Sequence, residues 1–201
     1  MMVFKGVFVC VEGLDGCGKT TQAKLLVRRL NRNYDAVYTA EPSSGKIGRF
    51  IKKHCLLGEK RSSGVVEALL FAADRFEHVE NIVLPAMQKG KIVVSDRYVY
   101  SSLAYQGATG LDLEWIWKIN EHAIPPDLAI FIDVRPETVV RRLKLKKSVM
   151  ENLETQRKVR EVYVEFVEKG ELVRVDGNKS QKEVAGDIAT VVLGFLKKTS
   201  K

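Results

Sequence analysis

The feature that most constrains the fold of this chain is a glycine-rich run from residue 13 to residue 20. It reads Gly13-Leu14-Asp15-Gly16-Cys17-Gly18-Lys19-Thr20 and lies between an apolar segment, residues 7–11, and a helix-forming segment, residues 18–31. The pattern G-x-x-x-x-G-K-[ST] in this context is typical of a phosphate-binding loop, and the alternative is an ordinary glycine-rich turn. Such a loop surrounds polyphosphate oxygens with backbone N–H groups at a helix N-terminus. The sequence therefore predicts an α/β protein that binds a nucleoside triphosphate.

Residues of this segment, the phosphate loop, have distinct expected roles. Three glycines permit positive φ and a close approach of the backbone to phosphate. Lys19 is expected to reach the β- and γ-phosphates, and the Thr20 hydroxyl to bind Mg²⁺. The candidate nucleotide-binding residues here are Gly13, Leu14, Asp15, Gly16, Cys17, Gly18, Lys19, Thr20 and Thr21.

Apolar, β-branched runs alternate with helical patterns along the rest of the chain, which favours a parallel sheet built from β-α units. The expected strands are residues 7–11, 36–39, 91–95, 128–133 and 172–175. The expected helices are residues 18–31, 48–55, 65–88, 113–122, 136–145, 152–169 and 181–198. Pro136 suits a first helical turn, and Ser180 suits the N-cap of the last helix. We expect a three-layer P-loop NTPase fold, with a parallel five-stranded sheet flanked by helices, as one domain over residues 1–201.

Composition narrows the class of protein. Of the 201 residues, 45% are hydrophobic and 29% charged, and no apolar run approaches the roughly 20 residues of a membrane span. The N-terminus lacks a signal-peptide layout, so we expect a cytoplasmic protein without a membrane partner. Its three cysteines show no C-x-x-C spacing and support neither a disulfide framework nor a zinc site. The net charge of +8 is spread out without interleaved aromatics, which favours small anionic substrates over nucleic acid.

A second charged site follows the expected strand 91–95, where Asp96 and Arg97 stand side by side. Ligands of open α/β sheets bind beyond the carboxyl ends of the strands, so both residues should lie beside the phosphate loop. Asp96 could hold Mg²⁺ through water, and Arg97 could neutralise phosphate charge. A strand-end salt bridge or a helix cap is the alternative.

A third feature lies in the expected helix 65–88. Phe71 and Arg75 are four residues apart and therefore project from one helix face. A flat aromatic ring beside a guanidinium can stack on and hydrogen-bond a nucleobase or an anion. The alternative is a core residue at Phe71 and a surface ion pair at Arg75.

Three blocks together resemble the thymidylate kinase family. They are residues 12–22, which contain the phosphate loop, residues 69–75 (LLFAADR) and residues 96–107 (DRYVYSSLAYQG), in the order and spacing of that family. The resemblance extends over essentially the whole chain, and the third block is its most specific part. It implies transfer of the γ-phosphoryl group of Mg·ATP to dTMP, giving dTDP and ADP in dTTP synthesis, by a homodimer formed through helices such as 65–88.

The resemblance also implies roles for single residues. Phe71 would stack on thymine, Arg75 would contact the base and the acceptor phosphate, and Arg97 would bridge the phosphates of donor and acceptor. Asp15 would bond the deoxyribose 3′-hydroxyl, and the ring of Tyr105, in a segment that should start the next helix, would leave no room for a 2′-hydroxyl. Other implied contacts are with thymine (Ser101, Ser102, Gln106), the acceptor phosphate (Glu41, Pro42), Mg²⁺ (Thr20, Asp96) and adenine (Arg142, residues 176–178).

Two places depart from the pattern of the family. Many relatives have an Arg next to the Glu-Pro turn, whereas here Ala40 precedes it and two serines follow, so Lys46 or Arg49 would have to supply that contact if it is made. The expected lid, about residues 141–152, has Ser148 and Met150 in place of the usual arginine and aromatic before its Glu. In this family, a basic residue within the phosphate loop goes with a lid that has no catalytic role. Here that position is Gly16, so the chain resembles the class whose lid supplies the catalytic cations.

The implied catalytic residues are therefore Asp15, Lys19, Arg97 and Lys147, with Lys146 and Arg142 as alternatives to Lys147; a solvated helix end is the other interpretation of this basic run. Two other functions remain open on the sequence. One is a monophosphate kinase with another base preference, and the other is a binding module that hydrolyses ATP slowly.

Overall fold

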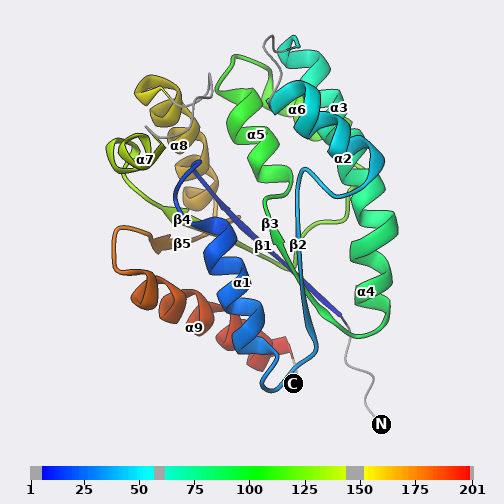
Figure 1. Cartoon of the computed structure of the whole chain (residues 1–201), viewed down its shortest axis with the longest axis vertical. Coiled ribbons are helices and arrows are strands. Elements are labelled where there is room, and N and C mark those ends of the chain that lie inside the picture. The colour runs from blue at the N-terminus through cyan, green and yellow to red at the C-terminus, as the bar shows by residue number, and fades with distance from the viewer. Residues whose placement is uncertain (1–5, 57–61, 144–151, 200–201) are drawn as a thin grey trace.

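The computed structural model describes residues 6–56, 62–143 and 152–199. Its centre is a five-stranded parallel sheet in the order β2-β3-β1-β4-β5 (Figure 1). The strands are β1 (Val7–Gly13), β2 (Ala36–Ala40), β3 (Ile92–Asp96), β4 (Leu128–Asp133) and β5 (Val173–Asp176). Every residue of β1 and β3 is buried, because helices cover both faces of the sheet and continuous apolar runs suit such strands.

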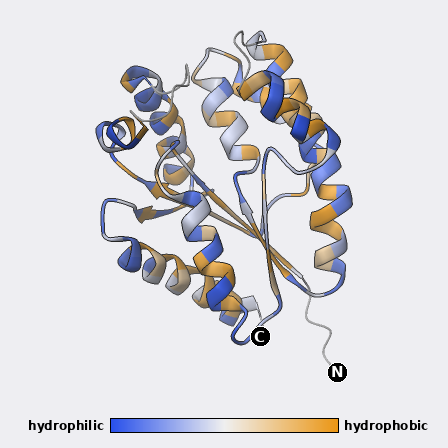
Figure 2. Ribbon diagram, in the orientation of Figure 1, coloured by the Kyte–Doolittle hydropathy of each residue, from blue (hydrophilic) through white to orange (hydrophobic). Residues whose placement is uncertain are grey.

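Helices form a layer on each side of the sheet. On one side lie α1 (Lys19–Leu30) and α9 (Gln181–Thr199), and on the other α3 (Gly64–His78), α4 (Leu84–Gln88), α5 (Val99–Gly107) and α8 (Leu153–Glu168) (Figure 1). The remaining helices, near the carboxyl ends of the strands, are α2 (Lys46–Ile51), α6 (Leu113–Ile119) and α7 (Pro136–Leu143). Figure 2 shows the apolar sheet between helices that have polar outer faces. The predicted three-layer α/β class is confirmed.

The strand predictions agree with the structure to within two residues at each end, but two of the expected helices contain π-helical turns. The expected helix 65–88 is interrupted by a π-helical turn, η2 (Val79–Val83), which precedes Pro85. Proline has no N–H to donate to the carbonyl four residues earlier and its ring crowds that carbonyl, so the helix widens there. A second π-helical turn, η1 (Lys52–Leu56), extends α2.

Hydrophobic periodicity does not predict helix α5, and the sequence indicates only that a helix should start beyond Asp96. Its segment, VYSSLAYQG, contains mostly β-branched, aromatic and serine residues, which are weak helix formers. Its N-cap, Tyr98, makes no local side-chain cap. The Tyr98 N–H instead donates to the Glu12 carboxylate at 2.8 Å, 86 residues earlier in the chain. Because this cap comes from β1, which is distant in the sequence, the residues around α5 contain no signal for it.

The sheet order determines what meets at its carboxyl edge. Because β1 pairs with both β3 and β4, the segments that follow these strands are brought side by side. This is the reversal point of strand order at which open α/β sheets bind ligands. Within the described ranges, each helix is either too short or too polar for a membrane span.

Candidate active site

The phosphate loop leaves β1 in the backbone conformation that its glycines allow. Gly13, Gly16 and Gly18 have φ of 148°, 79° and 101°. A Cβ on Gly13 would lie 2.8 Å from both Cys17 Sγ and the Ile132 carbonyl oxygen, so this position has no room for a side chain. Gly18 is the N-cap of α1, and the free N–H groups of the first helical turn therefore face the pocket side of the loop.

Lys19 is folded back into this loop. Its ammonium group donates to the carbonyl oxygens of Gly13 at 3.0 Å and Leu14 at 2.7 Å, and lies 3.8 Å from Cys17 Sγ. The residue is only 6% exposed. These bonds hold the positive charge at the centre of the loop, where triphosphate oxygens are expected.

Asp96, at the end of β3, meets α1. The Thr20 hydroxyl donates to Asp96 Oδ2, which also lies 3.4 Å from the Tyr38 hydroxyl of β2. The other carboxylate oxygen, Oδ1, is buried and has no hydrogen-bond partner among the described residues. A hydroxyl next to a carboxylate with one free oxygen suits a cation that retains several of its waters.

Arg97 turns back over the loop from the adjacent strand end. It has φ 75°, a conformation uncommon for residues other than glycine, and its N–H donates to the Val11 carbonyl at 3.0 Å. Its guanidinium is paired with Asp15, donates to Ser101 Oγ at 2.9 Å and lies 5.0 Å from the centre of the Tyr105 ring. The Tyr105 hydroxyl in turn accepts from the Asp15 N–H at 2.8 Å.

These contacts shift the titration of the pair. Burial by itself would raise the pKa of Asp15, but the charges of Arg97 and Lys19 outweigh it, and the pKa lies below its ordinary value. Burial opposes the charge of Arg97 as well, yet Asp15 raises the pKa of the guanidinium well above its usual value. Both groups are therefore charged at neutral pH.

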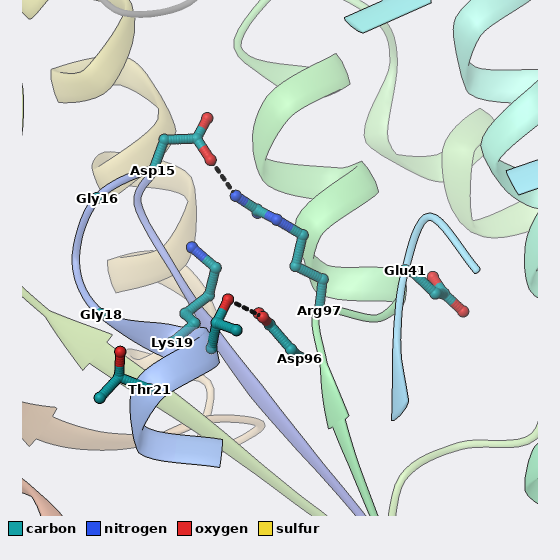
Figure 3. Close-up of a pocket in the computed structure, with 9 residues that line it drawn as sticks. Asp15, Gly16, Gly18, Lys19, Thr21, Glu41, Asp96 and Arg97 are labelled. Carbon is teal, nitrogen blue, oxygen red and sulfur yellow. Dashed lines mark hydrogen bonds and ion pairs between the residues drawn. The ribbon is translucent and has the colours of Figure 1, made fainter. Parts of the chain in front are cut away.

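A pocket of about 340 Å³ opens among these elements. In Figure 3, Asp15 of the phosphate loop and Arg97 of the neighbouring strand end point toward each other, and the segment that carries Glu41 lies on the far side of Arg97 from the loop. The pocket is lined by Asp15, Gly16, Gly18, Lys19, Thr20, Thr21, Glu41, Asp96 and Arg97.

A buried polar cluster lies beyond Glu41. The Arg75 guanidinium, 1% exposed, donates to Glu41 Oε2 at 2.7 and 3.0 Å, to Asn120 Oδ1 at 2.6 Å and to Ser102 Oγ at 3.1 Å. Glu41 Oε1 lies 3.1 Å from His78 Nδ1. These bonds use four of the five N–H donors of Arg75 and fix its plane, because a guanidinium is flat.

Comparisons with known proteins identify the family. A family model described as thymidylate kinase matches residues 11–188. A probable thymidylate kinase of Pyrococcus abyssi is 46% identical over 197 residues, which cover 94% of this chain and 96% of that protein. A probable thymidylate kinase of Thermococcus gammatolerans is 41% identical, over 93% of this chain and 96% of that protein. A probable thymidylate kinase of Pyrobaculum aerophilum is 42% identical, over 92% of this chain and 95% of that protein. The chain belongs to the thymidylate kinase family. The resemblance found from three sequence blocks is confirmed, and with it the enzyme class, a phosphotransferase.

The expected site residues of a thymidylate kinase occupy two neighbouring regions. Lys19, Thr20, Asp96, Arg97 and Asp15 meet at the phosphate loop. Ser101, Ser102 and Tyr105 lie on α5 and bond Arg97, Arg75 and the Asp15 N–H respectively. Gln106 is buried, Phe71 is half-buried on α3, and the Glu41–Pro42 bond is cis.

The lid is described only in part. Arg142, near the end of α7, donates from Nη1 to the Gly16 carbonyl at 3.3 Å. Leu143 is also close to Gly16, because a Cβ added to this glycine would lie 3.1 Å from Leu143 Cγ. The end of α7 therefore contacts the phosphate loop. Lys144, Lys146, Lys147, Ser148 and Met150 lie outside the described residues.

The thymidylate kinase site contains residues to which the sequence analysis gave no role. Glu12 is buried against α5 and α8, and His78 and Asn120 hold the Glu41–Arg75 pair. The sequence contained a signal for a role of Glu12, because a carboxylate directly follows the wholly apolar run 7–11. Asn120 and His78 had no such signal, because their partners are distant in the sequence.

Neither Lys46 nor Arg49 makes a described contact with the Glu41 cluster. Arg49 Nη1 donates to the Ser44 carbonyl at 2.6 Å on the surface, and Lys46 is exposed. Lys52 donates to the Ser43 carbonyl at 3.0 Å.

Proposed function

We propose that this protein transfers the γ-phosphoryl group of Mg·ATP to the 5′-phosphate of dTMP. A phosphate oxygen of dTMP forms a bond to the γ-phosphorus while the bond to the β,γ-bridging oxygen breaks, giving dTDP and ADP. One observation carries the proposal: Lys19 of the phosphate loop and Arg97 of the neighbouring strand end line a single pocket. Two cations from different elements can hold the donor triphosphate and the acceptor monophosphate, which would otherwise repel each other.

In this proposal the chain acts mainly by positioning and by neutralising charge. Lys19 gives up its two carbonyl contacts for β- and γ-phosphate oxygens. Arg97 lies between donor and acceptor phosphates, and Asp15, which bonds it, takes the deoxyribose 3′-hydroxyl. The Arg97–Asp15 pair is preformed, so little side-chain freedom remains to be lost when substrates bind.

Thr20 and Asp96 would hold Mg²⁺. Asp96 Oδ1 is buried and has no hydrogen-bond partner in the described part of the chain, and the Thr20 hydroxyl is adjacent to this carboxylate. Both groups fit this ion, which prefers one or two carboxylates, water and substrate phosphate to an all-protein cage. The described residues contain no group of three or more His, Cys, Asp or Glu side chains that could hold a metal without substrate. When bound, the ion would offset phosphate charge.

The acceptor base would occupy the region between α3 and α5. The Arg75 guanidinium uses four of its five N–H donors in hydrogen bonds to described residues, so one N–H remains for substrate. These bonds fix its orientation, and in this proposal it contacts the edge of thymine and the acceptor phosphate. Phe71, one turn earlier on α3 and half-buried, would stack on the ring. Ser101, Ser102 and Gln106 would line the thymine pocket, with Glu41 and Pro42 toward the phosphate.

We further propose that residues 141–152 form the lid of a single domain and that Lys147 supplies a catalytic cation. The contact of Arg142 with Gly16 supports a cover over the phosphate loop. Arg142 and the loop at residues 176–178 would contact adenine. Asn178 of that loop accepts from the Arg135 N–H at 3.1 Å and so joins the adenine loop to the end of β4.

A panel of nucleotides tests the substrate assignment. ADP release from Mg·ATP should depend on the monophosphate and be fastest with dTMP when dUMP, dGMP, dCMP and AMP are compared. Equal rates with a purine monophosphate would indicate a different monophosphate kinase. ADP release that does not respond to any monophosphate would indicate a binding module with slow hydrolysis.

We propose that the protein is a cytoplasmic homodimer. Val65, Val66 and Leu69 of α3 are 45%, 46% and 47% exposed, and Phe50 and Leu56 are similarly exposed. A second copy could cover this apolar face. The three cysteines are buried and form no disulfide within the described residues, as suits a reducing compartment. Sedimentation should give twice the chain mass, and Leu69→Glu should shift the species toward one chain; a wild-type monomer at micromolar concentration would refute the dimer.

A further inference from the structure

The carboxylate of Glu12 lies at the centre of a buried network behind the reaction site. The residue has no exposed surface and stands at the end of β1, directly before the phosphate loop. Its Oε1 accepts from the Tyr98 N–H at 2.8 Å. Its Oε2 accepts from Ser101 Oγ at 2.6 Å and from the Tyr163 hydroxyl at 3.1 Å. One side chain thus joins β1 to the start of α5 and to α8.

The network continues to Arg97. Ser101 donates its single hydroxyl proton to Glu12 and accepts from Arg97 Nη1 at 2.9 Å. Because Glu12 fixes the direction of that proton, a lone pair of Ser101 Oγ faces the guanidinium. The other side of the guanidinium is held by Asp15. Arg97 is therefore oriented by one acceptor from the phosphate loop and one from α5.

We propose that Glu12 is a positioning residue for phosphoryl transfer, which acts through Ser101 to set the Arg97 guanidinium and which Tyr163 of α8 helps to hold. Glu12 is not among the described residues that line the pocket at the phosphate loop. This inference rests on the proposed role of Arg97 as the bridge between donor and acceptor phosphates. The expected result of disturbing Glu12 is a lower rate of the chemical step with little change in ATP binding.

The Glu12→Gln substitution has nearly the same volume but replaces one of the two acceptor oxygens by an N–H₂ donor. Where this donor meets the two hydroxyls, Ser101 must reorient its proton and loses part of its capacity to accept from Arg97. Where it meets the Tyr98 N–H, the two donors repel and the start of α5, which carries Ser101, is displaced. We expect kcat at pH 8 to fall at least tenfold while KM for ATP stays within twofold. Tyr163→Phe removes one of the hydroxyls and should lower kcat by a smaller factor, about threefold.

A matched control is Tyr100→Phe on α5. The Tyr100 hydroxyl also faces a carboxylate, Glu171 Oε2 at 3.3 Å, but this pair has no described link to Arg97. The control should keep kcat within twofold of the wild type. If Glu12→Gln does not fold, the comparison of Tyr163→Phe with Tyr100→Phe decides the question, and equal kcat values for the two would overturn the proposal.

The Arg97→Lys background separates positioning from a general structural effect. A lysine cannot bond Ser101 and Asp15 in the same fork, so Glu12→Gln should lower kcat less than twofold further in this background. Multiplicative losses would overturn the proposal, as would a Glu12→Gln enzyme with wild-type kcat. If Arg97→Lys by itself leaves kcat unchanged, the proposed bridging role of Arg97 fails, and this result is distinct from a failure of Glu12 alone.

Discussion

Lys19 and Arg97 are both held by neutral or negative groups of the protein before any substrate is present. Lys19 donates to two carbonyl oxygens of its own loop, and Arg97 is paired with Asp15. Neither arrangement leaves a bare buried cation, which would cost several kcal/mol. Substrate phosphates can therefore replace or join existing partners of groups that are already oriented, and the expected consequences can be tested one residue at a time.

Lys19→Ala should abolish phosphoryl transfer and leave the fold intact. The lysine contributes charge to the phosphates, whereas its described contacts are with Cys17 Sγ and with two carbonyl oxygens that can turn to water. We expect kcat to fall by about 10³ or more. Steady-state rates with the far-UV circular dichroism of wild type and variant provide the test, and near-normal turnover would refute the assignment of the phosphate loop.

Tyr105 should control the choice between deoxyribose and ribose. Its ring is fixed by the Asp15 N–H and by Arg97, next to the carboxylate assigned to the 3′-hydroxyl. A 2′-hydroxyl beside this ring would clash or lose water without gaining a partner, which costs about 1–3 kcal/mol. Tyr105→Ala should reduce the ratio of kcat/KM for dTMP to that for its ribo counterpart.

Tyr105→Phe is the control for this experiment, because it retains the ring and loses only the hydroxyl. It should keep the preference for the deoxy sugar even if kcat changes. An unchanged ratio in Tyr105→Ala would show that Tyr105 has a packing role only.

At the scale of elements, α3 presents three faces with different roles. Its buried face carries Arg75 and His78, which hold Glu41, while Phe71 is only half-buried. The same helix presents an exposed apolar surface at its N-terminal end. A helix with three such faces has residues that can be changed without loss of the fold and others that cannot.

Phe71→Ala should weaken dTMP binding about tenfold and leave ATP binding unchanged. Stacking of a base on an aromatic ring is typically worth about 1–3 kcal/mol, and α3 belongs to the acceptor side in the proposal. Calorimetry with each nucleotide measures the effect. Phe76→Ala, on the same helix and also half-buried, is the matched control; equal losses for both nucleotides in Phe71→Ala would instead indicate a core residue.

For the molecule as a whole, stability should depend on pH through Glu12. Burial raises the pKa of this carboxyl from 4.5 to about 7, although hydrogen bonds from Ser101 and Tyr163 and the charge of Arg97 lower it. The folded state thus binds this proton more tightly than the unfolded state. The resulting stabilisation is fully present below about pH 4.5 and is lost as pH rises through about 7.

The Glu12→Gln variant cannot lose this stabilisation, so its free energy of unfolding relative to wild type should increase by up to about 3 kcal/mol between pH 4.5 and pH 8. Urea unfolding of both proteins at several pH values gives the difference, in which the titration of other groups largely cancels. A difference that is constant over this range would contradict the raised pKa.

The sequence by itself determined the phosphate loop, the five strands and the family, because these depend on local patterns: a glycine spacing, apolar runs and short motifs. Ser180 illustrates how local such signals are, since it and Glu183 bond each other's N–H groups at the start of α9, as its position predicts. The same reasoning placed Asp96 and Arg97 beside the loop, because parallel strands end at one edge.

The tertiary structure decided which groups bond one another within the site. Helix α5 begins where the Glu12 carboxylate from β1 accepts its first N–H, and Arg75 is fixed by Glu41, Ser102 and Asn120 from three other segments. Hydrogen bonds between residues tens of positions apart form only when packing has removed water and brought the elements together. No window of local sequence contains that information.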